Sequence, residues 1–118
     1  MQHLRRKHRK LGRTTAHRAS LLRNMAIGLF THGKIKSTDE KCKELRMFVE
    51  KLITRAKTDS VYSRRVVASR LNNDRDIVKK IFAEIAPKYT DRPGGYTRII
   101  KIANRHGDNA TVSLIELV

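Results

Sequence analysis

The sequence is poor in several residue types. Its 118 residues include one cysteine, Cys42, two prolines, three tyrosines, three phenylalanines and no tryptophan. A single cysteine cannot form an internal disulfide or a cysteine-rich zinc site. No apolar run approaches the roughly 20 residues of a membrane helix, and the N-terminus lacks the continuous apolar segment of a secretory signal. These absences predict a soluble protein without disulfides or membrane spans.

Acidic residues are also scarce, and they are unevenly distributed. Lys and Arg number 27 against 11 Asp and Glu, so the net charge is +16. Residues 1–38 contain ten Lys or Arg and no acid, and the first carboxylate belongs to Asp39. Such an excess of positive charge on a small chain predicts a polyanionic partner such as nucleic acid.

The densest cationic run spans residues 5–10, where Leu4 and Leu11 are the only flanking apolar side chains. Its like charges repel one another, so we expect no stable structure in the free protein. A nuclear-localisation signal, an organelle transit peptide and a solvated tail are alternative interpretations. We favour direct contact with phosphates, because transit peptides are rich in serine and Ser20 is the only serine before Ser37.

Apolar residues recur at the 3.6-residue period of an α-helix in four segments. The first segment can be capped by Thr14 or Thr15 and ends at Gly33. The second is predicted to start with a capping box between Ser37 and Glu40. The predicted core positions of these two segments are Leu21, Leu22, Met25, Ala26, Leu29, Phe30, Cys42, Leu45, Phe48, Val49, Leu52, Ile53 and Ala56.

The third and fourth helical segments have shorter apolar stripes. The third spans residues 60–71, and the turn at residues 72–74 separates it from the fourth, which we expect to end at Pro87. The predicted core positions here are Val61, Val67, Ala68, Leu71, Ile77, Val78, Ile81, Phe82 and Ile85.

Three segments have the composition of β-strands. Residues 97–104 and 111–118 are rich in β-branched residues and are separated by turn residues at 106–109, which predicts an antiparallel hairpin. A two-stranded ribbon is marginally stable alone, so we expect residues 34–37 to pair beside it. The predicted fold is α+β, with about four helices on a small three-stranded sheet in a body at residues 15–118, behind a basic arm at residues 1–14.

No pattern typical of an enzyme or a metal site is found. The five histidines lie at no metal-binding spacing from cysteines or carboxylates, and the acids form no cluster suited to two-metal cleavage. Gly94 and Gly95 mark a turn rather than a phosphate-binding loop. Cys42 lies on a helical stripe, which predicts a packing role. We therefore expect no catalytic residue, no metal, no cofactor and no small-molecule substrate, and a nuclease is disfavoured.

The distribution of aromatic residues indicates which nucleic acid binds. The three phenylalanines lie on helical stripes and Tyr62 has no clear place, which leaves Tyr89 and Tyr96 as possible surface rings. The arm is basic without aromatics, so it favours contact with phosphates over stacking on bases. Folded RNA, whose phosphates can surround an extended arm, fits this pattern. A DNA-binding protein stays an alternative, since Arg18 and Arg23 lie on a helix.

Several sequence blocks resemble one known family. They stand in its order and spacing, and together they are specific. This chain is similar to the bacterial large-subunit ribosomal protein seventeen family in residues 17–25, 43–46, 52–57, 92–99 and 107–110.

The resemblance implies a structural, non-catalytic protein of the large ribosomal subunit in the cytoplasm. Its implied partners are large-subunit ribosomal RNA and neighbouring ribosomal proteins, and its implied fold is a compact α+β body with an N-terminal extension set into RNA. Its implied role is to support subunit assembly and translation. The residues that we expect to bind RNA are His3, Arg5, Arg6, Lys7, His8, Arg9, Lys10, Arg13, His17, Arg18, Arg23, Asn24, Arg92, Gly94, Gly95, Tyr96 and Arg98.

Overall fold

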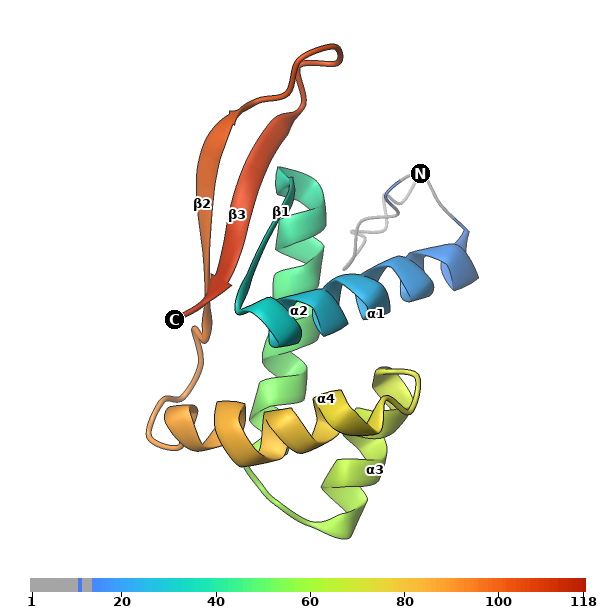
Figure 1. Ribbon diagram of the computed structural model, residues 1–118, viewed down its shortest axis with the longest axis vertical. Helices are drawn as coiled ribbons and strands as arrows, with labels where there is room; N and C mark the ends of the chain where they lie inside the picture. The colour runs from blue at the N-terminus through green and yellow to red at the C-terminus, as the bar shows by residue number, and fades with distance from the viewer. Residues whose placement is uncertain (1–10, 12–13) are drawn as a thin grey trace, which may run out of the picture.

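The chain folds as an α+β protein in which helices surround a long central helix and a sheet extends from one end (Figure 1). The computed structural model describes residue 11 and residues 14–118. Within them, the elements in chain order are α1 (Thr15–His32), β1 (Lys34–Thr38), α2 (Asp39–Ala56), α3 (Val61–Arg70), α4 (Arg75–Lys80), the π-helical turn η1 (Ile81–Ile85), the 3-10 turn η2 (Ala86–Tyr89), β2 (Thr97–Asn104) and β3 (Thr111–Leu117).

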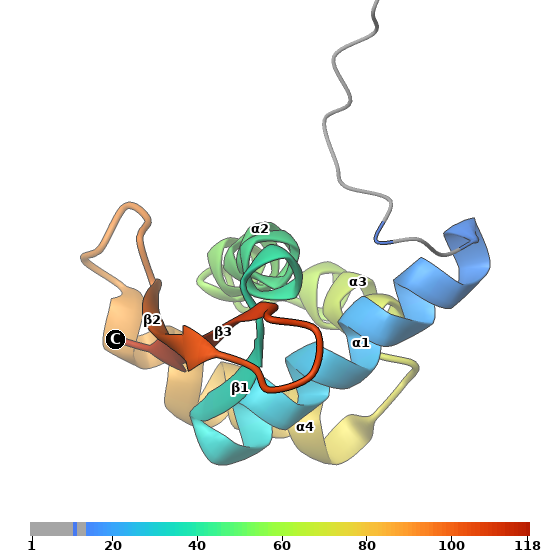
Figure 2. The ribbon, with the colours of Figure 1, turned by 90° about the horizontal axis from the view of Figure 1, so that it is seen from above.

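The sheet has three antiparallel strands in the order β1-β3-β2, which confirms the predicted hairpin and the predicted third strand. Ile115 in the central strand is opposite Ile35 on one side and Ile99 on the other. The alternating side chains of β3 that include Ser113 and Ile115 are buried. Helix α2 lies against this face, as both views of the ribbon show (Figures 1 and 2). The sheet is therefore stabilised by α2 on one face.

Helix α2 supplies the largest share of the core. Its fully buried apolar side chains are Cys42, Leu45, Val49 and Ile53, which follow one another at helical spacing. Burial raises the pKa of the Cys42 thiol to about 11, so this thiol stays protonated at neutral pH. The predicted packing role of Cys42 is confirmed. No helix in the described part of the chain is long and apolar enough to cross a membrane.

Most predicted helix ends are confirmed. The Thr14 hydroxyl accepts a hydrogen bond from the His17 N–H at 3.3 Å, and Gly33 closes α1 in the left-handed conformation at φ 81°. The predicted capping box at Ser37 is wrong. Ser37 pairs with β3 as part of β1, so the N-cap position falls on Thr38, whose side chain makes no capping hydrogen bond.

Two further expectations about the helices need correction. The helical path does not end at Pro87 but continues to Tyr89, because the Ala86 N–H reaches back five residues and Pro87 then lies in the first positions of a 3-10 turn, where no N–H is needed. Val61 is 67 % exposed and does not join the core. It lies six residues before the buried Val67, which places the two side chains about 120° apart around the helix.

Asp39 provides a test of how α2 is joined to the sheet. Its carboxylate is 5 % exposed and accepts hydrogen bonds from the Ser113 hydroxyl at 2.8 Å and the Lys43 ammonium at 2.9 Å. These bonds lower the pKa of Asp39 below its ordinary value, and the bond from Lys43 has the largest effect. Because the pKa is lower in the folded state, the stabilisation is present above the unfolded pKa and is lost as pH falls through the folded value.

We expect Asp39→Asn to lower the free energy of unfolding by about 1–3 kcal/mol near neutral pH, since a buried charged acceptor is removed. The variant should also lose less stability than the parent when pH falls below about 4. Denaturant unfolding at several pH values measures both effects. Asp91→Asn, at an exposed position of the turn after η2, is the control and should change neither. Equal acid sensitivity of parent and Asp39→Asn would contradict the assignment.

Candidate nucleic-acid interface

Eight of the predicted RNA-binding residues lie outside the described residues. They are His3, Arg5, Arg6, Lys7, His8, Arg9, Lys10 and Arg13. The division into an arm at residues 1–14 and a body at residues 15–118 therefore stays a prediction. The remaining predicted residues fall into two groups, one on α1 and one that extends from the turn after η2 into the start of β2.

The first group lies along α1. His17 and Asn24 are exposed and Arg18 is partly exposed, while the first turn of the helix contains no acid. The N-terminal N–H groups of a helix carry partial positive charge, so this helix end favours an anion together with the nearby Arg18 side chain. Arg23 is also tied to the body, because its Nε donates to the carbonyl of Arg70 at 3.3 Å.

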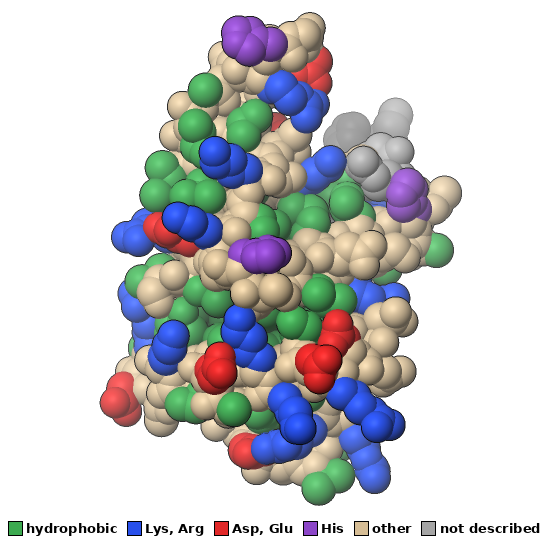
Figure 3. Space-filling view, in the orientation of Figure 1, with side chains coloured by type: hydrophobic (Ala, Val, Ile, Leu, Met, Phe, Trp, Pro, Cys, Tyr) green, Lys and Arg blue, Asp and Glu red, His purple; other side chains and the backbone are tan. Residues whose placement is uncertain are grey.

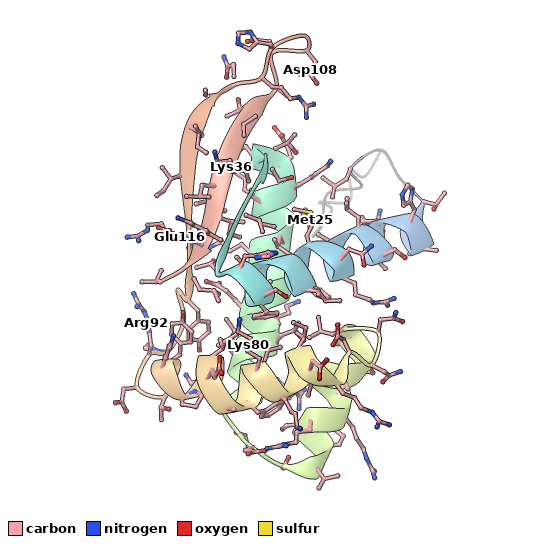
Figure 4. All side chains as sticks on the ribbon, viewed as in Figure 1. Met25, Lys36, Lys80, Arg92, Asp108 and Glu116 are labelled. Carbon is pink, nitrogen blue, oxygen red and sulfur yellow. The ribbon has the colours of Figure 1, made fainter. Side chains whose placement is uncertain are left out.

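The second group is the turn before β2, and Lys57 holds it against α2. The Lys57 ammonium donates to the Arg92 carbonyl at 2.6 Å and to the Tyr96 hydroxyl at 3.1 Å. The Thr54 hydroxyl donates to the same phenol oxygen at 3.2 Å. These two hydrogen bonds lower the pKa of Tyr96, and the bond from Thr54 has the largest effect. The turn therefore has a fixed position, and the Arg92 side chain is exposed on it (Figure 4).

Tyr89 and Tyr96 are not surface rings, and that expectation is wrong. Tyr89 is 3 % and Tyr96 1 % exposed, and their ring centroids lie 5.1 Å apart. Burial raises the pKa of Tyr89, whose hydroxyl donates to the Val118 carbonyl at 2.8 Å. Both rings complete the core beneath the turn, because their hydroxyls find partners inside the protein. The Tyr96 ring has no surface to offer to a base.

The two glycines of the turn differ in conformation. Gly95 has φ 65°, in the left-handed region that glycine adopts without strain. A side chain at either Gly94 or Gly95 would meet no protein atom within 4 Å, so the backbone here faces open space. Arg98, the second residue of β2, pairs with Glu116 at 2.7 Å, and its side chain is 57 % exposed. Contact of these residues with RNA stays a prediction.

Sequence reasoning missed the role of Lys57. The residue follows Ala56, the last buried position of α2, and it therefore leaves the helix end directed at the turn. Its position just beyond an apolar stripe was the available signal. It also missed Tyr62 and Arg55, which lie together on the surface with the guanidinium carbon 5.6 Å from the ring centroid.

Cationic side chains outnumber acidic ones in the described part of the chain. Figure 3 shows Lys and Arg side chains on the sheet and on the helices, with fewer Asp and Glu between them. Several of these acids already have cationic partners, as in Asp59 with Arg64 and Asp108 with Arg105. Hydrogen bonds from Arg105, which has the largest effect, and from the Ala110 N–H lower the pKa of Asp108 to about 2. Within residues 11 and 14–118, no three His, Cys, Asp or Glu side chains come together as metal ligands.

These features define a class of protein: a small, strongly cationic α+β body with a positive surface suited to a polyanion. The family model described as "Ribosomal protein L17" matches residues 21–118. A curated relative from Halothermothrix orenii, named "Large ribosomal subunit protein bL17", is 54 % identical over 110 residues, which cover 93 % of this chain and 96 % of that protein. The chain belongs to the ribosomal protein L17 family, and the resemblance seen in its sequence blocks is confirmed.

The hydrogen bond between Lys57 and Tyr96 leads to a measurable prediction. In Lys57→Gln, the phenol oxygen of Tyr96 keeps its bond from Thr54 but loses the charged donor, so the pKa of Tyr96 should rise. NMR titration with ring-labelled tyrosine measures this pKa separately from those of Tyr62 and Tyr89. Lys36→Gln removes the same charge from an exposed position of β1 and should leave the titration unchanged. An unchanged pKa in Lys57→Gln would show that the hydrogen bond is absent in solution.

Proposed function

We propose that this protein is a structural component of the large ribosomal subunit that binds large-subunit ribosomal RNA through its basic N-terminal arm and its body surface. It thereby supports subunit assembly and translation in the cytoplasm. Membership of the ribosomal protein L17 family is the observation that carries this proposal. The acid-free first 38 residues support the arm as the principal RNA-binding segment. Neighbouring ribosomal proteins are its other partners.

The mechanism is electrostatic. Each Lys or Arg that neutralises a phosphate releases condensed counterions, so an RNA crevice that surrounds the arm gains affinity from every such pair. The body fixes the point at which the arm enters, because the cap at Thr14 sets the start of α1. Arg18 extends the proposed positive surface from the arm onto α1, and Arg92 presents a second cation from the turn. This arrangement recognises phosphates and shape rather than base sequence.

Removal of residues 1–13 tests the role of the arm. These residues contain six Lys or Arg and precede the first helix, so the truncated protein should fold but bind large-subunit RNA poorly. The plot of log affinity against log salt should become shallower by about 0.7–0.9 for each phosphate that the arm no longer neutralises. Filter binding at several salt concentrations gives both values.

The matched control removes the same number of charges from the body. It replaces six exposed cations by glutamine, at Lys36, Arg65, Arg75, Lys79, Lys88 and Lys101. We expect this variant to retain more affinity than the truncated protein. If the truncated protein keeps full affinity at physiological salt, the arm is not the principal RNA-binding segment.

A competition experiment separates ribosomal RNA from duplex DNA as the partner. We expect the full chain to prefer folded large-subunit RNA strongly at fixed salt, and to sediment with the large subunit through a sucrose gradient after a high-salt wash. Equal affinity for duplex DNA, or a peak of free protein, would contradict the proposed function.

A further inference from the structure

A broad groove runs between α2 and α3. Of the described residues predicted to bind RNA, Gly94 and Tyr96 line this groove and none of those on α1 does. Its volume is about 1040 Å³, and its third side is formed by Pro93 and Gly94 of the turn before β2. Helix α3 lies beside the lower end of α2 in Figure 1. Pockets that bind small molecules usually measure about 300–1,000 Å³, so the groove is large enough to hold a group of that size.

The groove is positively charged. Lys51, Arg55 and Arg70 line it, and none of them makes an ion pair within the part of the chain that the structure describes. Glu50 is the acid on its wall, and its carboxylate already accepts from the Thr97 hydroxyl at 3.3 Å and lies 3.8 Å from Arg46. Three cations without an acidic partner in a concave site favour phosphate groups.

Tyr62 gives the groove an aromatic surface. This side chain is 67 % exposed, whereas the other two tyrosines are buried, so it has no role in the core. The Arg55 guanidinium lies 5.6 Å from the centre of its ring. An exposed ring next to a guanidinium is the combination on which unpaired bases stack, because every base has a π-face and the cation meets the adjoining phosphate.

We propose that this groove binds an unpaired segment of ribosomal RNA, with a base stacked on Tyr62 and phosphates held by Lys51, Arg55 and Arg70. The inference rests on the proposed function and names a second RNA-binding site, which differs in chemistry from the arm. The arm neutralises phosphates of any RNA shape. The groove favours a base free of its helix, since a paired base must first be unpaired and unstacked to reach the ring. The protein would thus recognise a bulge or loop at this site.

Substitutions at residue 62 test the stacked base. Tyr62→Ala should weaken the binding of full-length protein to large-subunit RNA by about 5- to 100-fold, while Tyr62→Phe, which keeps the ring, should stay within about twofold of the parent. Val61→Ala is the control, because Val61 is equally exposed, at 67 %, and does not line the groove. Circular dichroism of each variant verifies the fold.

Paired arginine substitutions test the phosphate-binding role of the groove. Arg70 lines the groove and Arg65 does not, although both are exposed on α3. Arg70→Gln should therefore weaken RNA binding by several-fold more than Arg65→Gln, although the two variants lose the same charge. Equal effects of the two substitutions would show that only net charge matters, which overturns the groove as a specific site.

A direct probe is a single-stranded uridine oligonucleotide. Stacking on Tyr62 should perturb the ring resonances of this tyrosine but not those of the buried Tyr89, which does not line the groove, and an RNA duplex of equal length should produce no such change. If Tyr62→Ala binds RNA as the parent does while removal of residues 1–13 weakens binding, the groove proposal fails and the proposed function stands. If Tyr62→Ala weakens only incorporation into the subunit, the groove binds a protein and the proposal is also overturned. If the full chain shows no preference for ribosomal RNA, the proposed function itself fails.

Discussion

Mutual repulsion among positive charges is the constraint on which the other features of this protein depend. A net charge of +16 on 118 residues opposes any compact state, so the body must separate its cations and pair part of them with acids. It does so with local pairs such as Asp39 with Lys43 and Asp59 with Arg64. The uncompensated remainder faces outward. A polyanion that binds this surface neutralises the repulsion, and because it binds the folded state it also stabilises the fold.

Helix α2 is the element that joins the separate parts of the body. Its start is held to β3 by the bond from Ser113 to Asp39, its middle is buried in the core, and its end fixes the turn before β2 through Lys57. The sheet, the turn and the groove are therefore positioned relative to one helix. A rigid helix of 18 residues is an effective scaffold for binding a large folded RNA, because the distances between the groups that it positions stay constant.

The two RNA-binding sites that we propose follow different physical rules. Binding of the arm to phosphates depends on the number of charges and weakens steeply with salt. The groove at Tyr62 adds a base-stacking interaction, which depends on the shape and pairing of the RNA. In the first site the affinity comes from charge, and in the second the choice of an unpaired nucleotide comes from an aromatic ring beside Arg55.

The α+β class, the hairpin, the third strand, the helix ends at Thr14 and Gly33 and the family could all be predicted from the sequence, because they depend on local periodicity, capping chemistry and ordered motif blocks. The burial of Tyr96 and the exposure of Tyr62 could not, since the burial of a ring depends on which distant segments cover it. The same holds for the strand position of Ser37 and for the continuation of the helical path beyond Pro87, where pairing with β3 and a wider helical turn outweigh the local signals. The groove likewise arises from segments that are far apart in the sequence, such as those of Tyr62 and Gly94, and chain-local patterns carry no information about their proximity in space.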